Sequence, residues 1–380
     1  MNKVLWFLLI VSVAKGQQAP LPAQYQPFRQ LIKHYKTYFS GSLSVLDQVK
    51  PPLIHDTDEY TTNEFRVMLS DSALALHKEE LVIRVPYKNN LYPVSYSVIY
   101  ENRLVSLFEQ GQFACLSIDK LKRDINYEKK LNTKQFDYHW LLGGQLVALS
   151  KGIYYWFDTK AGWRLYAEPV PFGKQPKFYE DDRYVAYSTC RGEFGGTLYF
   201  HDKQTRLTHF SPYVCARSVI RQSDGYYVLA SLGHGVGSAD LSLIKNPSEL
   251  PILKRVNKYD TPEADSTQLA DVVKPTVLFD KLAVEFFAGF MFNSRLTYVV
   301  SWFGRTFLAE VFDDTIYIKD PLGNNNMDTH EPVTTSYGPN LTLINLGFYM
   351  VGGEREISCL LFKRNQLVKI DWNLRNKPIE

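Results

Sequence analysis

Charged and aromatic side chains in the turns between apolar, strand-like runs are the residues best suited to bind a ligand. Guanidinium groups form paired hydrogen bonds to carboxylates or sulfates, and aromatic rings stack on the apolar faces of ligands. We expect one face of the fold to carry a site for a polar ligand, formed by the following residues: Arg191, Glu193, Arg217, His234, Glu354 and Arg355. Trp302 lies in a similar turn and extends this set. The competing interpretation is that these turns are ordinary solvated loops.

The glycine-rich string from Gly233 to Gly237 has the composition of a lipase oxyanion motif or of a phosphate-binding loop. The chain has no GxSxG nucleophile motif, and no strand, turn and helix surround these glycines. We therefore interpret the string as a flexible loop that presents His234 to solvent. The histidines show no HxH or HExxH spacing, so no metal site is expected. His139 and His209 lie within strand-like runs and are interpreted as structural residues.

Carboxylates support the alternative function, a carbohydrate-active hydrolase or lyase. The candidates are Glu193, Asp224, Glu285 and Glu354. Hydrolysis of a glycosidic bond requires two carboxyl groups within roughly 5–10 Å of each other, and no sialidase-type Asp box indicates such a pair. An enzyme of this class would have two of these acids close together at one opening of the fold, whereas a binding module need not.

The N-terminus has the pattern of a signal peptide. Lys3 precedes an apolar run from Val4 to Val13, and small residues precede Gln17. An apolar run of about ten residues is too short to cross a bilayer, which takes roughly 20. We expect cleavage before Gln17 and a secreted or periplasmic protein without a membrane span. The 43 basic and 40 acidic residues are nearly balanced, so binding to nucleic acid is not expected.

A repeated pattern of strands predicts the fold. The segment 154–160 aligns with 198–204, because both are aromatic runs that reach an Asp and then a polar turn. Each is followed by a second run that contains Arg-Leu. The turns recur about every 40 residues, as in the four-stranded blades of a β-propeller. Aromatic residues make up 14% of the chain, which also favours β-sheet.

We expect an all-β protein, a single β-propeller of six or seven four-stranded blades after a short N-terminal helical extension. Six units are counted, near residues 93–131, 136–170, 175–213, 214–255, 272–313 and 338–374. Strands between Phe65 and Pro86 are expected to join the blade formed by the C-terminal segment. A short helix is expected over 27–38, and 255–274 and 321–339 are expected to be surface loops.

Glycine pairs and aromatic residues within these units resemble degenerate kelch repeats. Gly143-Gly144 is followed by the aromatic run 155–158 and by Trp163. Gly352-Gly353 and Gly195-Gly196 stand in similar positions before later aromatic strands. Most units lack one of these features. The resemblance implies a β-propeller fold and assigns no functional residue.

The four cysteines fall into two groups. Cys115 and Cys359 lie within apolar runs and are expected to be buried thiols. Cys190 lies where the second strand of one blade should end, and Cys215 lies where the innermost strand of the next should begin. These two positions meet on one face of a propeller, so we expect a disulfide with a Cα separation of roughly 4.4–6.8 Å.

The expected organisation is a signal peptide over 1–16, an N-terminal extension over 17–58 and a β-propeller over 59–380. The leading hypothesis is an exported, monomeric binding module that takes a polar ligand, a glycan or a protein through loops on one face of the ring and needs no cofactor. An inert structural module is a third possibility, because the propeller fold alone does not determine function.

Overall fold

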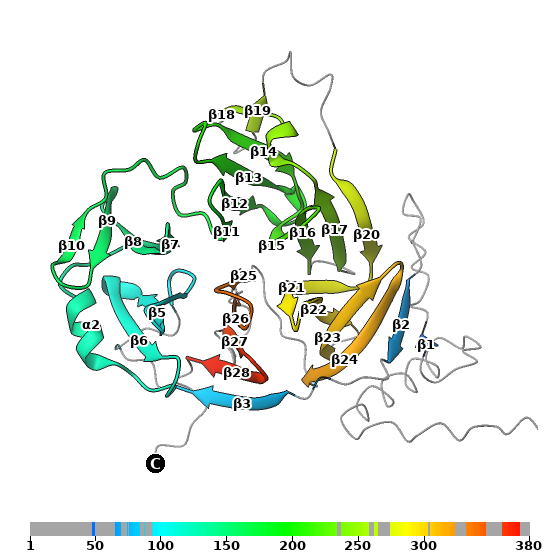
Figure 1. Ribbon diagram of the computed structural model, residues 1–380, viewed down its shortest axis with the longest axis horizontal. Helices are drawn as coiled ribbons and strands as arrows, with labels where there is room; N and C mark the ends of the chain where they lie inside the picture. The colour runs from blue at the N-terminus through cyan, green and yellow to red at the C-terminus, as the bar shows by residue number, and fades with distance from the viewer. Residues whose placement is uncertain are drawn as a thin grey trace, which may run out of the picture.

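The computed structural model describes residues 48–49, 65–69, 74, 76–83, 87, 93–233, 237–257, 262–264, 274–302, 305–323, 332–346 and 359–372. These residues form a six-bladed β-propeller, with the blades arranged around a common centre (Figure 1). The predicted signal peptide and the predicted helix over 27–38 lie outside the described residues. No helix among the described residues is long and apolar enough to span a bilayer.

Each blade is an antiparallel meander whose first strand lies nearest the centre. Blade one contains β4 (Val98–Tyr100), β5 (Arg103–Phe108) and β6 (Gln112–Ser117). Blade two contains β7 (Tyr138–Leu142), β8 (Gln145–Ser150), β9 (Ile153–Asp158) and β10 (Gly162–Leu165). Blade three contains β11 (Lys177–Glu180), β12 (Tyr184–Cys190), β13 (Gly196–Asp202) and β14 (Thr208–Pro212).

The other three blades follow the same order. Blade four contains β15 (Ala216–Gln222), β16 (Gly225–Leu232), β17 (Ser238–Ile244) and β20 (Thr276–Leu282). Blade five begins with β21 (Glu285–Phe292), β22 (Arg295–Trp302), β23 (Arg305–Phe312) and β24 (Thr315–Gly323). Blade six begins with β25 (Val333–Ser336), β26 (Leu341–Asn345), β27 (Cys359–Lys363) and β28 (Gln366–Asp371).

The N-terminal strands are added to the outside of two blades. β3 (His77–Val82) pairs in parallel with β28, so the predicted pairing with the C-terminal blade is confirmed. The prediction is wrong for β2 (Arg66–Leu69), which was expected in the same blade but pairs in parallel with β24 of blade five and carries β1 (Gln48–Val49) on its outer edge. β1, β2 and β3 do not form a seventh blade. Blade six already has four strands of its own, β25 to β28, and β3 is a fifth strand on its outer edge. β25 lies within the segment 321–339, which was expected to be a loop.

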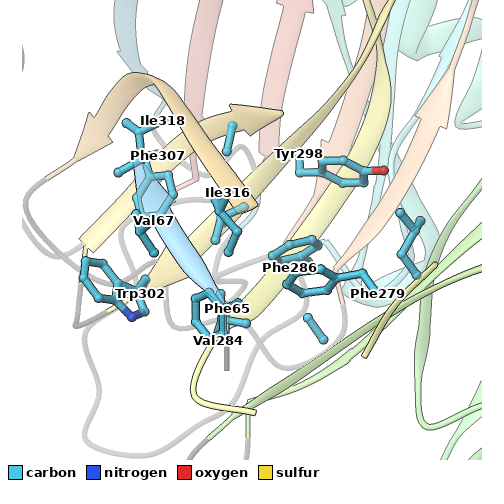
Figure 2. Close-up of a cluster of buried hydrophobic side chains, with 14 of the residues drawn as sticks. Phe65, Val67, Phe279, Val284, Phe286, Tyr298, Trp302, Phe307, Ile316 and Ile318 are labelled. Carbon is cyan, nitrogen blue, oxygen red and sulfur yellow. The ribbon is translucent and has the colours of Figure 1, made fainter. Parts of the chain in front are cut away.

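A buried aromatic cluster holds β2 against blade five. Phe65 and Val67 are 1% and 2% exposed and pack with Trp302, Phe307 and Ile316 (Figure 2). Full burial of a side chain such as Phe or Val contributes about 1.5–3 kcal/mol, enough to fix a four-residue strand to the sheet. Trp302 was expected at the rim of the ligand site. It is 2% exposed and belongs to this core instead.

The outer strand of blade four differs from the expected one. The predicted unit ended near residue 255, but β18 (Leu253–Val256) forms a separate hairpin with β19 (Pro262–Ala264). β20, which was expected to begin blade five, pairs with β17 instead. The reason is burial, because β20 places Phe279 in the core at 2% exposure, whereas β18 is largely exposed.

A short helix replaces the fourth strand of blade one. In α2 (Ile125–Leu131) and its C-cap, side chains bind the outer edge of β6. Glu128 accepts a hydrogen bond from the backbone N–H of Cys115 at 3.0 Å. Asn132 accepts from the N–H of Phe113 at 2.7 Å and donates to its carbonyl at 2.9 Å. The edge of the sheet is therefore closed without another strand.

Candidate functional site

A disulfide joins blades three and four on the face that bears the connections between second and third strands. Cys190 ends β12, Cys215 directly precedes β15, and their Cα atoms are 4.5 Å apart. The predicted disulfide is confirmed. We call this side of the ring the disulfide face. In the loop-entropy description, closing a loop of 25 residues stabilises the fold by about 3 kcal/mol.

A small pocket beside the disulfide contains three basic residues. Lys174, Arg191 and Arg217 line a cavity of about 240 Å³, together with Cys190. Its other lining residues are uncharged, so none of the described residues that line it is a carboxylate. We call this cavity the basic pocket. It brings together Arg191 and Arg217, two of the six residues expected to form a ligand site.

A β-bulge sets the position of Arg217. The pairing of β15 with β16 shifts register between Ala216 and Ser218, which leaves Arg217 as the extra residue. A bulge changes the direction of a side chain relative to the sheet. Arg217 is 4% exposed, and its Nε donates a hydrogen bond to the carbonyl of Ser231 at 3.0 Å. A buried guanidinium is thus held at the wall of the basic pocket.

Thr189 supplies a polar atom to the same pocket. Its Oγ1 is buried, and it has no hydrogen-bond partner among the described residues. Leaving a buried hydroxyl without a partner costs about 1–3 kcal/mol. Thr189 lines the pocket, so rotation of its side chain would bring this hydroxyl within reach of a ligand oxygen.

The loop that follows Cys190 forms a tight turn, Gly192–Phe194. The backbone N–H of Arg191 donates to the carbonyl of Gly195 at 2.8 Å, and Gly192 and Gly195 have φ of 60° and 86°, which glycine tolerates best. Glu193 is exposed on this turn and does not line the basic pocket. His234, Glu354 and Arg355 lie outside the described residues.

Lys174 was missed by the sequence analysis. It lies in the connection from blade two to blade three, whereas the candidate loops were taken from connections within blades, with Arg217 added at the start of an inner strand. In an antiparallel meander of four strands, connections between blades emerge on the same face as those between second and third strands. Counting both kinds of connection would have placed Lys174 beside Arg191 and Arg217.

A larger cavity, of about 1260 Å³, occupies the central channel and reaches the opposite face. Glu180 lies in its wall and accepts hydrogen bonds from the N–H of Gly143, at 2.9 and 3.0 Å, and from Lys177 Nζ at 2.7 Å. Lys203 Nζ lies 3.4 Å from the other carboxylate oxygen. Burial lowers the pKa of Lys177, and the Glu180 carboxylate opposes that effect. Glu180, Lys177 and Lys203 bind one another. No sequence motif marks this cluster, so the sequence analysis did not find it.

Two of the candidate acids lie on opposite faces of the ring. Glu193 lies on the disulfide face, whereas Asp224 lies in the turn between β15 and β16 on the opposite face. Glu285 begins β21, so it lies on the disulfide face with Glu193, and its carboxylate lies against Gly233 and Gly237. Glu354 lies outside the described residues. Glu193 and Asp224 therefore cannot flank the same glycosidic bond.

The histidines and thiols expected to be structural are buried. His139 is 1% exposed, and its two ring nitrogens lie 2.6 Å from Ser95 Oγ and 3.2 Å from the carbonyl of Val105. Burial lowers the pKa of His139 to about 4, so the ring is neutral at physiological pH. Cys115 and Cys359 are buried free thiols, and burial raises the pKa of both.

Comparison with models of protein families gives no match, and comparison with curated proteins gives none either. Several solved structures are similar at low sequence identity. BamB from Moraxella catarrhalis is 10% identical, with a TM-score of 0.35, over 67% of this chain and 82% of that one. The Cps50 (Swd1) β-propeller domain of Myceliophteria thermophila is 11% identical, with a TM-score of 0.32, over 64% and 77%. The N-terminal domain of Nup159 is 10% identical, with a TM-score of 0.34, over 81% and 89%.

Proposed function

We propose that this chain is an exported binding module that takes an anionic group into the basic pocket on the disulfide face. The observation that carries the proposal is the charge of the lining: Lys174, Arg191 and Arg217, with no carboxylate among the described lining residues. Arginine forms paired hydrogen bonds to carboxylate, phosphate or sulfate, and lysine adds a point charge.

The size of the basic pocket limits what enters it. Its volume of about 240 Å³ is below the roughly 300–1000 Å³ of pockets that enclose a whole small-molecule ligand. A single carboxylate, phosphate or sulfate group fits this space. The rest of the ligand then lies on the disulfide face, which agrees with binding through loops at one end of the ring.

Two features support export. Residues 1–16 have the pattern of a signal peptide, which is a prediction from the sequence. The Cys190–Cys215 disulfide is of the kind that persists in oxidising compartments such as the extracellular space or the periplasm.

Titration of acetate, inorganic phosphate and inorganic sulfate at low chloride concentration tests the proposal. Isothermal calorimetry should show saturable binding of at least one anion to a single site, with the melting temperature raised accordingly. Arg191→Gln and Lys174→Gln should each weaken this binding at least several-fold. Arg164→Gln is the matched control, because it removes the same charge from β10, where that side chain is 57% exposed.

The three anions distinguish a carboxylate site from a phosphate or sulfate site. The proposal is wrong if no anion binds saturably, or if Arg164→Gln reduces binding as much as the two pocket variants. That second result would mean that only the overall charge of the protein matters.

A further inference from the structure

Two apolar side chains project from the disulfide face close to the disulfide. Phe194 is 77% exposed and lies four residues after Cys190. Val214 is 43% exposed and directly precedes Cys215. Aromatic residues and arginine are enriched at protein interfaces relative to the rest of the surface, so Phe194 and the nearby Arg191 are candidates for an interaction surface. We call Phe194, Val214 and Arg191 the disulfide-face patch.

The disulfide-face patch is rigid. The turn that carries Phe194 is closed by backbone hydrogen bonds from Phe194 N–H to the carbonyl of Arg191, at 3.2 Å, and from Gly195 N–H to that of Gly192, at 3.0 Å. The Cys190–Cys215 disulfide then ties this turn to the segment that carries Val214. Because the anchor residues are fixed before binding, little conformational entropy is lost when a partner docks.

The combination of side chains indicates the kind of partner. Aromatic residues and arginine dominate the binding energy of protein interfaces, and Arg191 and Phe194 belong to the same turn. The basic pocket adjoining the patch favours a negative charge on the partner. A carboxylate beside an apolar side chain meets both requirements, and acidic peptide segments offer that pairing.

We propose that the disulfide-face patch docks an acidic segment of a partner protein. An Asp or Glu side chain of the partner enters the basic pocket, and neighbouring apolar side chains pack on Phe194 and Val214. This inference rests on the proposed anion site and adds the class of partner.

Selection from a phage-displayed library of random 12-residue peptides tests the inference, with the exported form of the chain immobilised under oxidising conditions. Selected peptides should be enriched in Asp or Glu within two or three positions of an aromatic or aliphatic residue. The affinity of a synthetic copy is then measured by fluorescence polarisation. Phe194→Ser and Arg191→Gln should each weaken it about tenfold or more.

Phe312→Ser is the matched control. Phe312 is 69% exposed and ends β23 on the opposite face, so its replacement removes an equally exposed ring without changing the disulfide-face patch. The inference is overturned if no peptide is selected, if the peptides lack acidic residues, or if Phe194→Ser binds them as tightly as the unmodified chain.

A parallel array of carboxylated and sulfated glycans shows whether another class of ligand is bound. Binding to these glycans without binding to peptides also overturns the inference. Anion titration of Phe194→Ser separates the two proposals. If Phe194→Ser binds acetate, phosphate or sulfate and also binds the peptide as tightly as the unmodified chain, the proposed partner is wrong and the proposed anion site is retained.

Discussion

Replacing Thr189 by valine should have opposite effects on stability and on binding. The Thr189 hydroxyl is buried in the wall of the basic pocket without a hydrogen-bond partner among the described residues. Valine has nearly the same shape and needs no partner. Removing the unsatisfied group should recover part of its cost of about 1–3 kcal/mol, so the free energy of unfolding should rise by about 1 kcal/mol.

The same replacement should weaken anion binding. In the complex the hydroxyl would donate to a charged oxygen, and a hydrogen bond to a charged group is worth about 1.5–3 kcal/mol. Since about 1.4 kcal/mol corresponds to a factor of ten, Thr189→Val should lower the affinity by about tenfold or more. Urea unfolding without anion and calorimetric titration with the best anion measure the two effects separately.

Thr334→Val is the control for this experiment. Thr334 is 3% exposed, its hydroxyl also lacks a partner among the described residues, and it lines the central cavity rather than the basic pocket. Its replacement should raise stability and leave the anion affinity unchanged. If Thr189→Val destabilises the protein, or if its anion affinity equals that of the unmodified chain, the assignment of Thr189 to the anion site is refuted.

Two further predictions concern the stability of the blades. Asn132→Ala removes both hydrogen bonds to the edge of β6 and should lower the free energy of unfolding by about 2–4 kcal/mol, measured by urea denaturation. Asp240 lies directly opposite Asp280 in the β17–β20 pair, and burial, with a smaller effect from Asp280, raises the pKa of Asp240 to about 6. Because the folded pKa is above the unfolded value of 3.8, the free energy of unfolding should decrease as the pH rises from about 4 through 6. Asp240→Asn should flatten this part of a profile of melting temperature against pH. If the profile of the variant equals that of the unmodified chain, the prediction is wrong.

Much of the fold could be predicted because the propeller repeats its chemistry along the chain. Aromatic strands that end in Asp before a polar turn, such as those ending at Asp158 and Asp202, indicated the blades. The order of strands then placed Cys190 beside Cys215 without a structure. Details that depend on competition between segments could not be predicted. β20 joined blade four because Phe279 gained burial there, and no local pattern contains that information.

The helix α2 shows a second limit of prediction. It has seven residues, which is too few to show a clear helical period, and it exists because Glu128 and Asn132 bind the edge of β6. Only part of the basic pocket could be predicted from the sequence. Arg191 and Arg217 followed from the repeat, whereas Lys174 required knowing which face the connections between blades share.

The walls of the basic pocket are held in place by contacts that the free protein already makes, and this favours binding. Lys174, Arg191 and Arg217 line one small cavity without a carboxylate among the described lining residues. The disulfide joins Cys190 to Cys215 beside the pocket, and Arg217 donates a hydrogen bond to the carbonyl of Ser231. An anion in the pocket would be attracted by these three positive charges. The free protein is thus preorganised for a negative charge, and reorganising the pocket on binding would cost little free energy.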